Sequence, residues 1–353
     1  MRLGLNLGYW GAGNDADNLV LAQEADKLGY DSVWVAEAYG SDAPTVLSWV
    51  GAHTQRIGLG AAVLQIPART PAMTAMTAAT LDSLSGGRFR LGLGVSGPQV
   101  SEGWHGVRFA KPLSRTREYV EIVRKALARE RLEYAGEHWT LPLPDGAGKP
   151  IKLTVHPVRE RIPVYLASVG PKNLELTGEI ADGWLAIFFS PEHADVSLAH
   201  VRTGREKVSG GAQDPMAGFD VVPTVPVAIA DDLDQAALGI RAYAALYVGG
   251  MGSREQNFYN ALACRMGFED EAATVQDLYL ARKYAEAAAA VPRDFIDATS
   301  LIGPADRIRD RMHAFAEAGV TTLSVVPFAP TLEARLDHVR RMAEILEASG
   351  LAE

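Results

Sequence analysis

The chain is poor in cysteine, in long apolar runs and in positive charge. Its single cysteine, Cys264, cannot form an intramolecular disulfide, which is typical of proteins from the reducing cytoplasm. No apolar run reaches the roughly 18 residues that a membrane helix needs. The 43 acidic residues outnumber the 34 basic ones, so the net charge is −9, and no basic cluster offsets it. We therefore expect no membrane span and no nucleic-acid partner.

Motifs of several enzyme classes are also missing. The eight histidines are scattered, without a His-x-x-x-His pair, so we expect no metal site. No Gly-x-Ser-x-Gly elbow follows a strand, which argues against a serine hydrolase. No Gly-x-Gly-x-x-Gly opens the first helix, which argues against a doubly wound dinucleotide fold. Met1 and Arg2 lead directly into an apolar segment, which predicts a cytoplasmic protein without a signal peptide.

The residues that are present describe a globular α/β protein. Of the 353 residues, 48% are hydrophobic and 22% are charged, enough for one large barrel or two modest domains. One pattern recurs along the chain. Gly29 and Gly319 each end a helix with an apolar stripe, and an apolar strand follows almost at once. A glycine at this position is a common helix end, so each site marks a helix-to-strand unit.

Eight segments are predicted to be strands, and helical stripes lie between them. Short apolar strands that alternate with helices are typical of a parallel sheet buried on both faces. The pattern predicts a single (β/α)8 TIM barrel over residues 1–353. The expected strands are residues 2–8, 32–37, 57–65, 88–95, 163–168, 182–188, 219–229 and 320–326.

Two segments interrupt this alternation. Residues 133–160 hold short apolar runs at 137–141 and 151–155 around a turn rich in proline and glycine, which indicates a hairpin insertion. Residues 249–300 are too long for one strand-to-helix connection. Their alanine-rich composition favours either a lid or extra helices beside the seventh strand. We expect neither insertion to be an independent domain.

In a barrel of this kind the chemistry takes place at the carboxyl ends of the strands. Glu37 follows the second expected strand. Because Ser41 and Asp42 can already cap the next helix, Glu37 has no evident structural task. We predict that it orients a ring or acts as an acid or base.

Other positions after the strands allow two interpretations each. Tyr9 and Trp10 suit either a pocket for a flat ring or a plug over the barrel core. The glycines and alanines of residues 57–65 favour either close approach by a ring or tight packing. Arg69 suits an anionic group, although a solvated surface position is the commoner outcome. His105 is a candidate acid or base, or a structural histidine.

The most informative feature follows the fifth expected strand. The strand ends at Ser168 and Gly170, and Pro171 then occupies a position that suits the first turn of a helix. The free amides of such a helix start favour an anion, and Lys172 adds a positive charge. We therefore predict a phosphate-binding site here, which implies a phosphorylated cofactor or substrate.

Several segments together resemble the bacterial luciferase-like superfamily, and they occur in that family's order over most of the chain. The resemblance implies a (β/α)8 barrel that is commonly dimeric. These segments are SVWVAE (32–37), LDSLSGGRF (81–89), LGLG (91–94), IPVYLA (162–167) and ADGW (181–184).

Two further segments, EAYGSDA (37–43) and QIPARTPAM (65–73), are similar to the branch that uses the deazaflavin coenzyme F420. The resemblance implies that this ring lies in the barrel mouth, with a non-prolyl cis peptide at Ala62-Val63 bulging against it. It places the coenzyme's phosphate on the loop at 168–171. With Lys172 added, the expected cofactor-binding residues are Glu37, Ala38, Ala62, Val63, Gln65, Ser96, Gly97, Ser168, Val169, Gly170, Pro171 and Lys172.

The chain departs from this branch at two proton-transfer positions. Alcohol and sugar-phosphate dehydrogenases of the branch carry a histidine where this chain has Ala38, and an acid where it has Pro98 and Gln99. We therefore predict hydride transfer from the deazaflavin C5 to a C=C, C=N or C=O group of a small organic substrate. Glu37 and His105 are the expected catalytic residues, and Tyr9, Trp10 and Trp104 would shape the substrate face with His105.

Two other functions stay open at this point. Reduced FMN also carries a phosphate on a ribityl chain, so the same loop would serve a monooxygenase that uses FMN and dioxygen. A protein that binds a flavin or deazaflavin without catalysis is the second alternative. In each case we expect a homodimer in the cytoplasm.

Overall fold

The computed structural model describes residues 1–10 and 15–352. Within these ranges eight parallel strands close into a barrel, because the last strand pairs with the first and each of the others with its neighbours. This confirms the predicted (β/α)8 fold. In order around the barrel the strands are β1 (Arg2–Asn6), β2 (Ser32–Val35), β3 (Gly58–Ala61), β5 (Phe89–Gly94), β8 (Val164–Ala167), β9 (Gly183–Ile187), β10 (Asp220–Ile229) and β12 (Thr322–Pro327).

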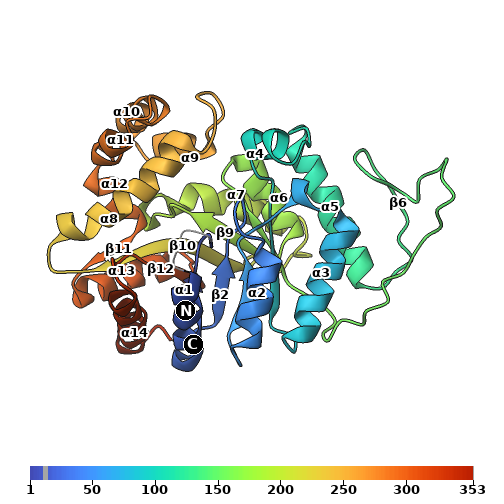
Figure 1. The fold of residues 1–353 in the computed structure, drawn as a ribbon, viewed down its shortest axis with the longest axis horizontal. Helices are drawn as coiled ribbons and strands as arrows, with labels where there is room; N and C mark the ends of the chain where they lie inside the picture. The colour runs from blue at the N-terminus through green and yellow to red at the C-terminus, as the bar shows by residue number, and fades with distance from the viewer. Residues whose placement is uncertain (11–14, 353) are drawn as a thin grey trace.

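Helices surround the barrel, and both chain ends lie at the end opposite to the one at which the β2 arrow points (Figure 1). The main helices around the barrel are α1 (Asp15–Leu28), α2 (Ala43–Ala52), α3 (Pro71–Leu84), α5 (Pro112–Leu127), α6 (Pro171–Ile180), α7 (Ala194–Glu206), α13 (Ala305–Glu317) and α14 (Leu332–Ser349). Short helices precede three of them: η1 (Ile66–Ala68), α4 (Pro98–Gly103) and η2 (Pro191–His193).

The interior of the barrel is filled by large side chains. Trp34 is completely buried there and meets Tyr165 edge to face, with ring centroids 5.2 Å apart. A Cβ atom added to Gly60 would lie 2.1 Å from the Trp34 ring. Of the two interpretations of this bare strand, tight packing therefore accounts for Gly60.

The third expected strand is divided in two. Residues 57–65 form β3 and a separate short strand, β4 (Leu64–Gln65), which pairs with β5. The interruption falls at Ala62-Val63, whose peptide bond is cis, as the family resemblance predicts.

The first insertion contains a hairpin, but not the one expected. Its strands are β6 (Tyr134–Ala135) and β7 (Thr140–Leu141), which pair in antiparallel fashion. The expected partner run at 151–155 forms no strand. Instead, the Ile151 carbonyl accepts a hydrogen bond from the Leu132 amide. The prediction was wrong because an apolar run alone does not specify its pairing partner.

The second insertion consists of extra helices. They share a buried apolar cluster with Phe188, Ala228 and α8 (Leu233–Ala245), and α9 and α10 lie at the end at which β2 points (Figure 1). This confirms the helical alternative beside the seventh barrel strand. The added elements are the π-helix η3 (Leu246–Gly250), α9 (Phe258–Arg265), α10 (Glu269–Leu280), α11 (Tyr284–Ala290), α12 (Arg293–Thr299) and strand β11 (Leu301–Gly303).

Glycines bring α6 and α7 unusually close together. A Cβ atom on Gly178 would lie 2.0 Å from the Val201 carbonyl oxygen, and one on Gly204 would lie 1.9 Å from the Glu175 carbonyl oxygen. Only glycine permits this approach at either position. The contact holds the two helices together, and both helices begin at the carboxyl end of the barrel.

Candidate active site

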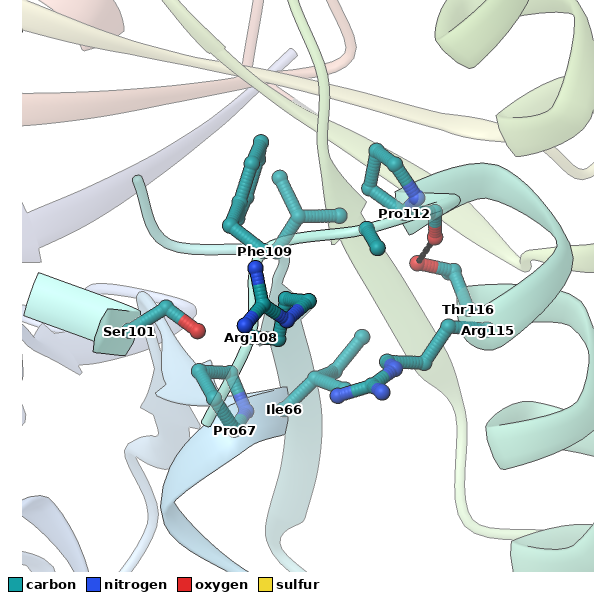
Figure 2. A pocket seen from close by; sticks show the side chains of 10 residues that line it. Ile66, Pro67, Ser101, Arg108, Phe109, Pro112, Arg115 and Thr116 are labelled. Carbon is teal, nitrogen blue, oxygen red and sulfur yellow. Dashed lines mark hydrogen bonds between the residues drawn. The ribbon is translucent and has the colours of Figure 1, made fainter. Parts of the chain in front are cut away.

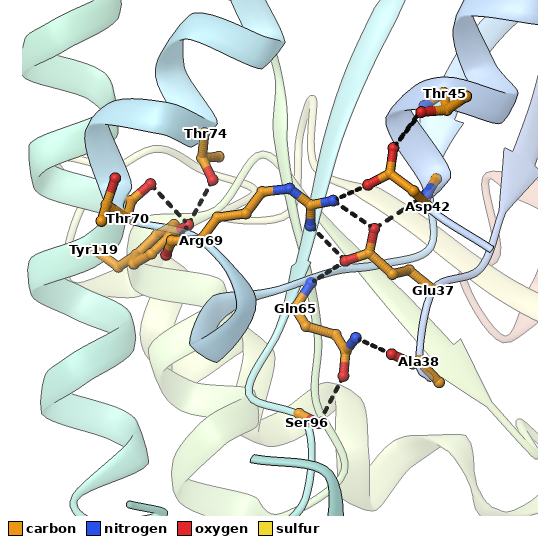
Figure 3. A network of polar contacts seen from close by, with 11 residues as sticks. Glu37, Ala38, Asp42, Thr45, Gln65, Arg69, Thr70, Thr74, Ser96 and Tyr119 are labelled. Atoms are coloured by element: carbon orange, nitrogen blue, oxygen red, sulfur yellow. Dashed lines mark hydrogen bonds and ion pairs between the residues drawn. The ribbon is translucent and has the colours of Figure 1, made fainter. Parts of the chain in front are cut away.

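Four of the predicted site residues meet at the carboxyl ends of β2, β4 and β5. The Gln65 side-chain amide donates to the Ala38 carbonyl at 2.6 Å and accepts from the Ser96 hydroxyl at 3.0 Å. The Gln65 backbone amide donates to Glu37 at 3.3 Å. Figure 3 shows these residues as one connected network. The fold thus brings together Glu37, Ala38, Gln65 and Ser96 from three separate segments.

Glu37 also has the structural partner that the sequence did not reveal. Arg69 forms two hydrogen bonds to its carboxylate, one of them 2.8 Å long, and Ala43 donates its amide to the same group. The Glu37 side chain is only 6% exposed. The premise that Glu37 lacks a structural task is therefore wrong.

Arg69 is neither a solvated surface residue nor a free anion-binding group. Its side chain is 14% exposed and contacts both Glu37 and Asp42. Burial by itself lowers the pKa of the Arg69 guanidinium, but its bonds to Glu37 and the nearby Asp42 raise the pKa above the usual value. Arg69 therefore stays charged and joins the β2 exit to the segment after β4.

The two expected helix caps have different tasks. Asp42 is the N-cap of α2 and accepts from the Thr45 amide at 3.0 Å, as predicted. Ser41 instead accepts from the Trp10 backbone amide at 3.1 Å. Ser41 therefore fixes the loop after β1 against the loop after β2.

The cis peptide lies beside this network. Ala62 and Val63 pack against the interior cluster of Trp34, Tyr165, Leu185 and Val222. Ser96, on the adjacent loop, has φ of +63°, a conformation that non-glycine residues seldom adopt and that is found preferentially at ligand sites. The next residue, Gly97, is the N-cap of α4.

A wall of tyrosines occupies the other side of the barrel mouth, and the sequence analysis missed all but one of them. The hydroxyl of Tyr9, after β1, lies 3.5 Å from that of Tyr247 in η3. Tyr243 and Tyr259 each lie within 5.0 Å of the Tyr247 ring, centroid to centroid. Burial raises the pKa of Tyr9 and Tyr247, so both hydroxyls stay protonated and can donate hydrogen bonds. The i, i+4 spacing of Tyr243 and Tyr247 before two glycines was the available signal.

The π-helix that carries Tyr247 is held by side chains of the second insertion. The buried Asn257 donates to the carbonyls of Tyr247 and Val248 at 3.0 and 2.9 Å. Gly249 and Gly250 allow Tyr279 of α10 to approach, since an added Cβ would lie 2.5 and 2.3 Å from that side chain. Short π segments frequently occur at functional sites.

The loop at 168–171 has the predicted form. Gly170 is the N-cap of α6 and Pro171 is its first residue. In the described part of the chain, the amides of Val169, Gly170 and Lys172 donate to no acceptor. Two hydrogen bonds fix the start of the loop. The Ser168 hydroxyl accepts from the Thr177 hydroxyl, and the Ser168 carbonyl accepts from the Trp184 indole, each at 2.9 Å. Lys172 is exposed and has no ion pair within the described ranges.

His105 does not join the network. It follows α4, and its Nε2 atom is buried without a hydrogen-bond partner in the described part of the chain. Its neighbour Trp104 is 66% exposed. A small pocket behind the Ser96 loop holds Arg108 and Arg115 and contains none of the predicted site residues (Figure 2). Neither feature adds to the Glu37 network.

Two features are absent from residues 1–10 and 15–352. No group of three or more His, Cys, Asp or Glu residues in that range is placed to hold a metal ion. No helix there combines the length and the apolar character that crossing a membrane requires.

The profile of the luciferase-like monooxygenase family matches residues 8–322, and the chain belongs to this family. A Mycobacterium tuberculosis protein whose name assigns it to the coenzyme F420-dependent oxidoreductases is 46% identical over 330 residues. The match covers 92% of this chain and 94% of that protein.

Two solved structures share the fold. The coenzyme F420 dependent tetrahydromethanopterin reductase from Methanopyrus kandleri superposes with a TM-score of 0.82 and 23% identity, over 97% of each chain. An F420-dependent secondary alcohol dehydrogenase in complex with an F420-acetone adduct superposes with a TM-score of 0.78 and 18% identity. That match covers 99% of this chain and 98% of the dehydrogenase.

Proposed function

We propose that this chain is a coenzyme F420-dependent oxidoreductase that transfers hydride to a small organic substrate. The observation that carries the proposal is the pairing of two features at one barrel mouth. One is the loop at 168–171 with its free amides, and the other is the Gln65 side chain, which links Ala38 to Ser96. The similarity to the Mycobacterium tuberculosis protein supports the choice of F420.

The residues of the chain fit a phosphorylated ring cofactor. The amides of Val169, Gly170 and Lys172 have no acceptor within the described ranges, so they are available to an anion at this helix start. An added Cβ on Gly170 would meet nothing within 4 Å, so there is open space above the loop. The amides of Val169, Gly170 and Lys172 would hold the phosphate, and Ala62, Val63, Ser96 and Gly97 would lie against the ring.

When bound, the deazaflavin supplies a hydride and scarcely reacts with oxygen. The task of the chain is then to position the reactants and exclude water. Glu37 is held by Arg69, and we propose that it acts through Gln65, which links the Ala38 carbonyl to Ser96 at the ring edge. Glu37 is thus a positioning residue in this proposal, and His105 stays a candidate proton donor.

The proposed substrate has a C=C, C=N or C=O group and not an alcohol. Ala38 and the Pro98-Gln99 pair carry no group that can remove a proton from an alcohol. The tyrosine wall instead offers protonated hydroxyls, at Tyr9 and Tyr247, which can donate a hydrogen bond to an electron-rich atom. This arrangement suits reduction better than oxidation.

Fluorescence titration of the purified chain with F420 and with FMN tests the cofactor. We expect tight binding of F420, and oxidation of reduced F420 without oxygen uptake when a panel of enones, imines and ketones is added. Preference for FMN, together with oxygen uptake when a flavin reductase supplies reduced FMN, would favour a monooxygenase instead. Tight binding of F420 without turnover of any panel member would favour a non-catalytic binding protein.

The homodimer and the cytoplasmic location stay predictions. Sedimentation velocity of the full chain tests the first, with two copies per particle as the expected result. Fractionation of the native cells tests the second, and recovery of the chain outside the cytoplasmic fraction would contradict it.

A further inference from the structure

A cavity opens beside the loop at 168–171, between the barrel and the second insertion. Its polar lining consists of Ser168, Ser190, His193, Ser197 and Arg265. The rest of the lining is apolar and includes Val169, Trp184 and Leu262. The cavity therefore joins the predicted phosphate loop to α9 of the insertion.

Arg265, the last residue of α9, brings a positive charge to this cavity. Its Nη2 atom donates to the Val169 carbonyl at 3.2 Å. In the described part of the chain Arg265 has no carboxylate partner. Desolvation lowers the pKa of its guanidinium, although the neighbouring Cys264 thiol acts in the opposite direction. A neutral carbonyl is thus the sole observed partner of this charge within the described ranges.

The surroundings of Arg265 also favour an anion. The first turn of α7 borders the cavity, and so do Ser168 and Val169, which directly precede the N-cap of α6. No acidic residue lines the cavity. Glu192, before α7, turns instead to Arg311 and Ser190, and Asp195 is exposed.

Another arginine of the same insertion is already neutralised. Arg254, in the loop before α9, contacts the Asp277 carboxylate. Arg265 is exposed as well, but it lines a cavity and bonds only to a backbone carbonyl within the described ranges. Charge-assisted hydrogen bonds from a guanidinium to a phosphate are about twice as strong as neutral ones.

We propose that Arg265 is a phosphate-binding residue, through which the inserted helix α9 holds the phosphate of the ribityl-linked cofactor against the loop at 168–171. This rests on the proposed function. It assigns the second insertion a direct part in cofactor binding, in addition to its contacts with the tyrosine wall. Arg265 would exchange the Val169 carbonyl for the phosphate, so cofactor binding and the position of α9 would be coupled.

Removing the phosphate from the ligand tests this proposal most directly. Dissociation constants are measured by fluorescence titration of the full chain with F420 and with the phosphate-free deazaflavin ribityl alcohol. We expect Arg265→Gln to weaken F420 binding by about 10-fold or more, and binding of the phosphate-free ligand by less than about 2-fold. Arg265→Lys should restore part of the loss, because it keeps the charge but not the planar fork.

Arg254→Gln is the matched control, since it removes one positive charge from the same insertion and should leave both constants unchanged. Equal weakening of both ligands by Arg265→Gln would show a structural role and overturn the proposal. Unchanged F420 binding would overturn it as well.

Failure of the proposed function would be visible in the wild-type chain, as absence of F420 binding. If the wild type binds FMN instead, the FMN and riboflavin pair carries the same comparison. If it binds neither phosphorylated ligand, both proposals are wrong.

Discussion

Arg69 and Glu37 form a two-pronged ion pair at the mouth of the barrel, with both side chains largely buried. The pair joins the exit of β2 to the segment after β4. Through the Gln65 amide it also fixes the residue that bridges Ala38 and Ser96. A carboxylate chosen from the sequence for chemistry is thus, in the structure, the anchor of the loop around it.

Replacing Glu37 by Gln should destabilise the protein. The change leaves Arg69 buried with a weaker partner, and loss of one member of a buried pair costs about 3 kcal/mol. Urea unfolding measures the difference. Asp42→Asn is the control: that side chain is 50% exposed, so we expect less than about 1 kcal/mol.

The same variant separates positioning from acid-base chemistry. If Glu37 acts through Gln65, F420 binding weakens and single-turnover hydride transfer slows by a factor that does not change with pH. A wild-type rate in Glu37→Gln would show that the residue has only a structural role. A new pH dependence would restore Glu37 as an acid or base.

Gly60→Ala should disturb the barrel interior. The added methyl would lie 2.1 Å from the buried Trp34 ring, and overpacking of this kind typically costs about 1–3 kcal/mol. Gly239→Ala in α8 is the control, because nothing lies within 4 Å of the added atom. That variant should be neutral or more stable by up to about 1 kcal/mol. Thermal unfolding of both variants measures the two stabilities, and equal stabilities of Gly60→Ala and Gly239→Ala would contradict the packing argument.

Acid should remove one stabilising contact between the β9 exit and α13. Hydrogen bonds from Arg311, together with one from Ser190, lower the pKa of Glu192 from 4.5 to about 2. Because the folded pKa is the lower one, the contribution is complete above pH 4.5 and is lost as the pH falls towards 2. The melting temperatures of the wild type and Glu192→Gln should differ at pH 7 and converge over this interval. A difference that persists below pH 2 would show that ionisation is not its source.

Lys172→Ala should weaken F420 binding by about 1–2 kcal/mol at low salt. The side chain is exposed at the start of α6, so the effect should shrink as salt is added. Lys149→Ala, in the first insertion, removes the same charge from a distant loop and serves as the control. Unchanged affinity for Lys172→Ala would show that its ammonium faces solvent and leaves the phosphate to other groups.

The sequence by itself determined the barrel and most of its boundaries. The hydrophobic periodicity of the helices and their ends at Gly29 and Gly319 reflect local backbone preferences, which do not depend on tertiary contacts. The Gly170-Pro171 helix start was predictable for the same reason, since proline and glycine act on the residues next to them. The cis bond at Ala62-Val63 was predicted from the family resemblance and not from the local residues.

Only the tertiary structure decided what the side chains meet. Glu37 and Arg69 are 32 positions apart, and Arg265 lies 96 positions from Val169, so neither pairing leaves a local mark on the sequence. The pairing of β7 with β6 could not be predicted from the sequence for the same reason. Nor could the contact with Trp34 that requires a glycine at position 60. Contacts of this kind are set by which strands and helices become adjacent when the barrel closes, and local preferences do not encode that adjacency.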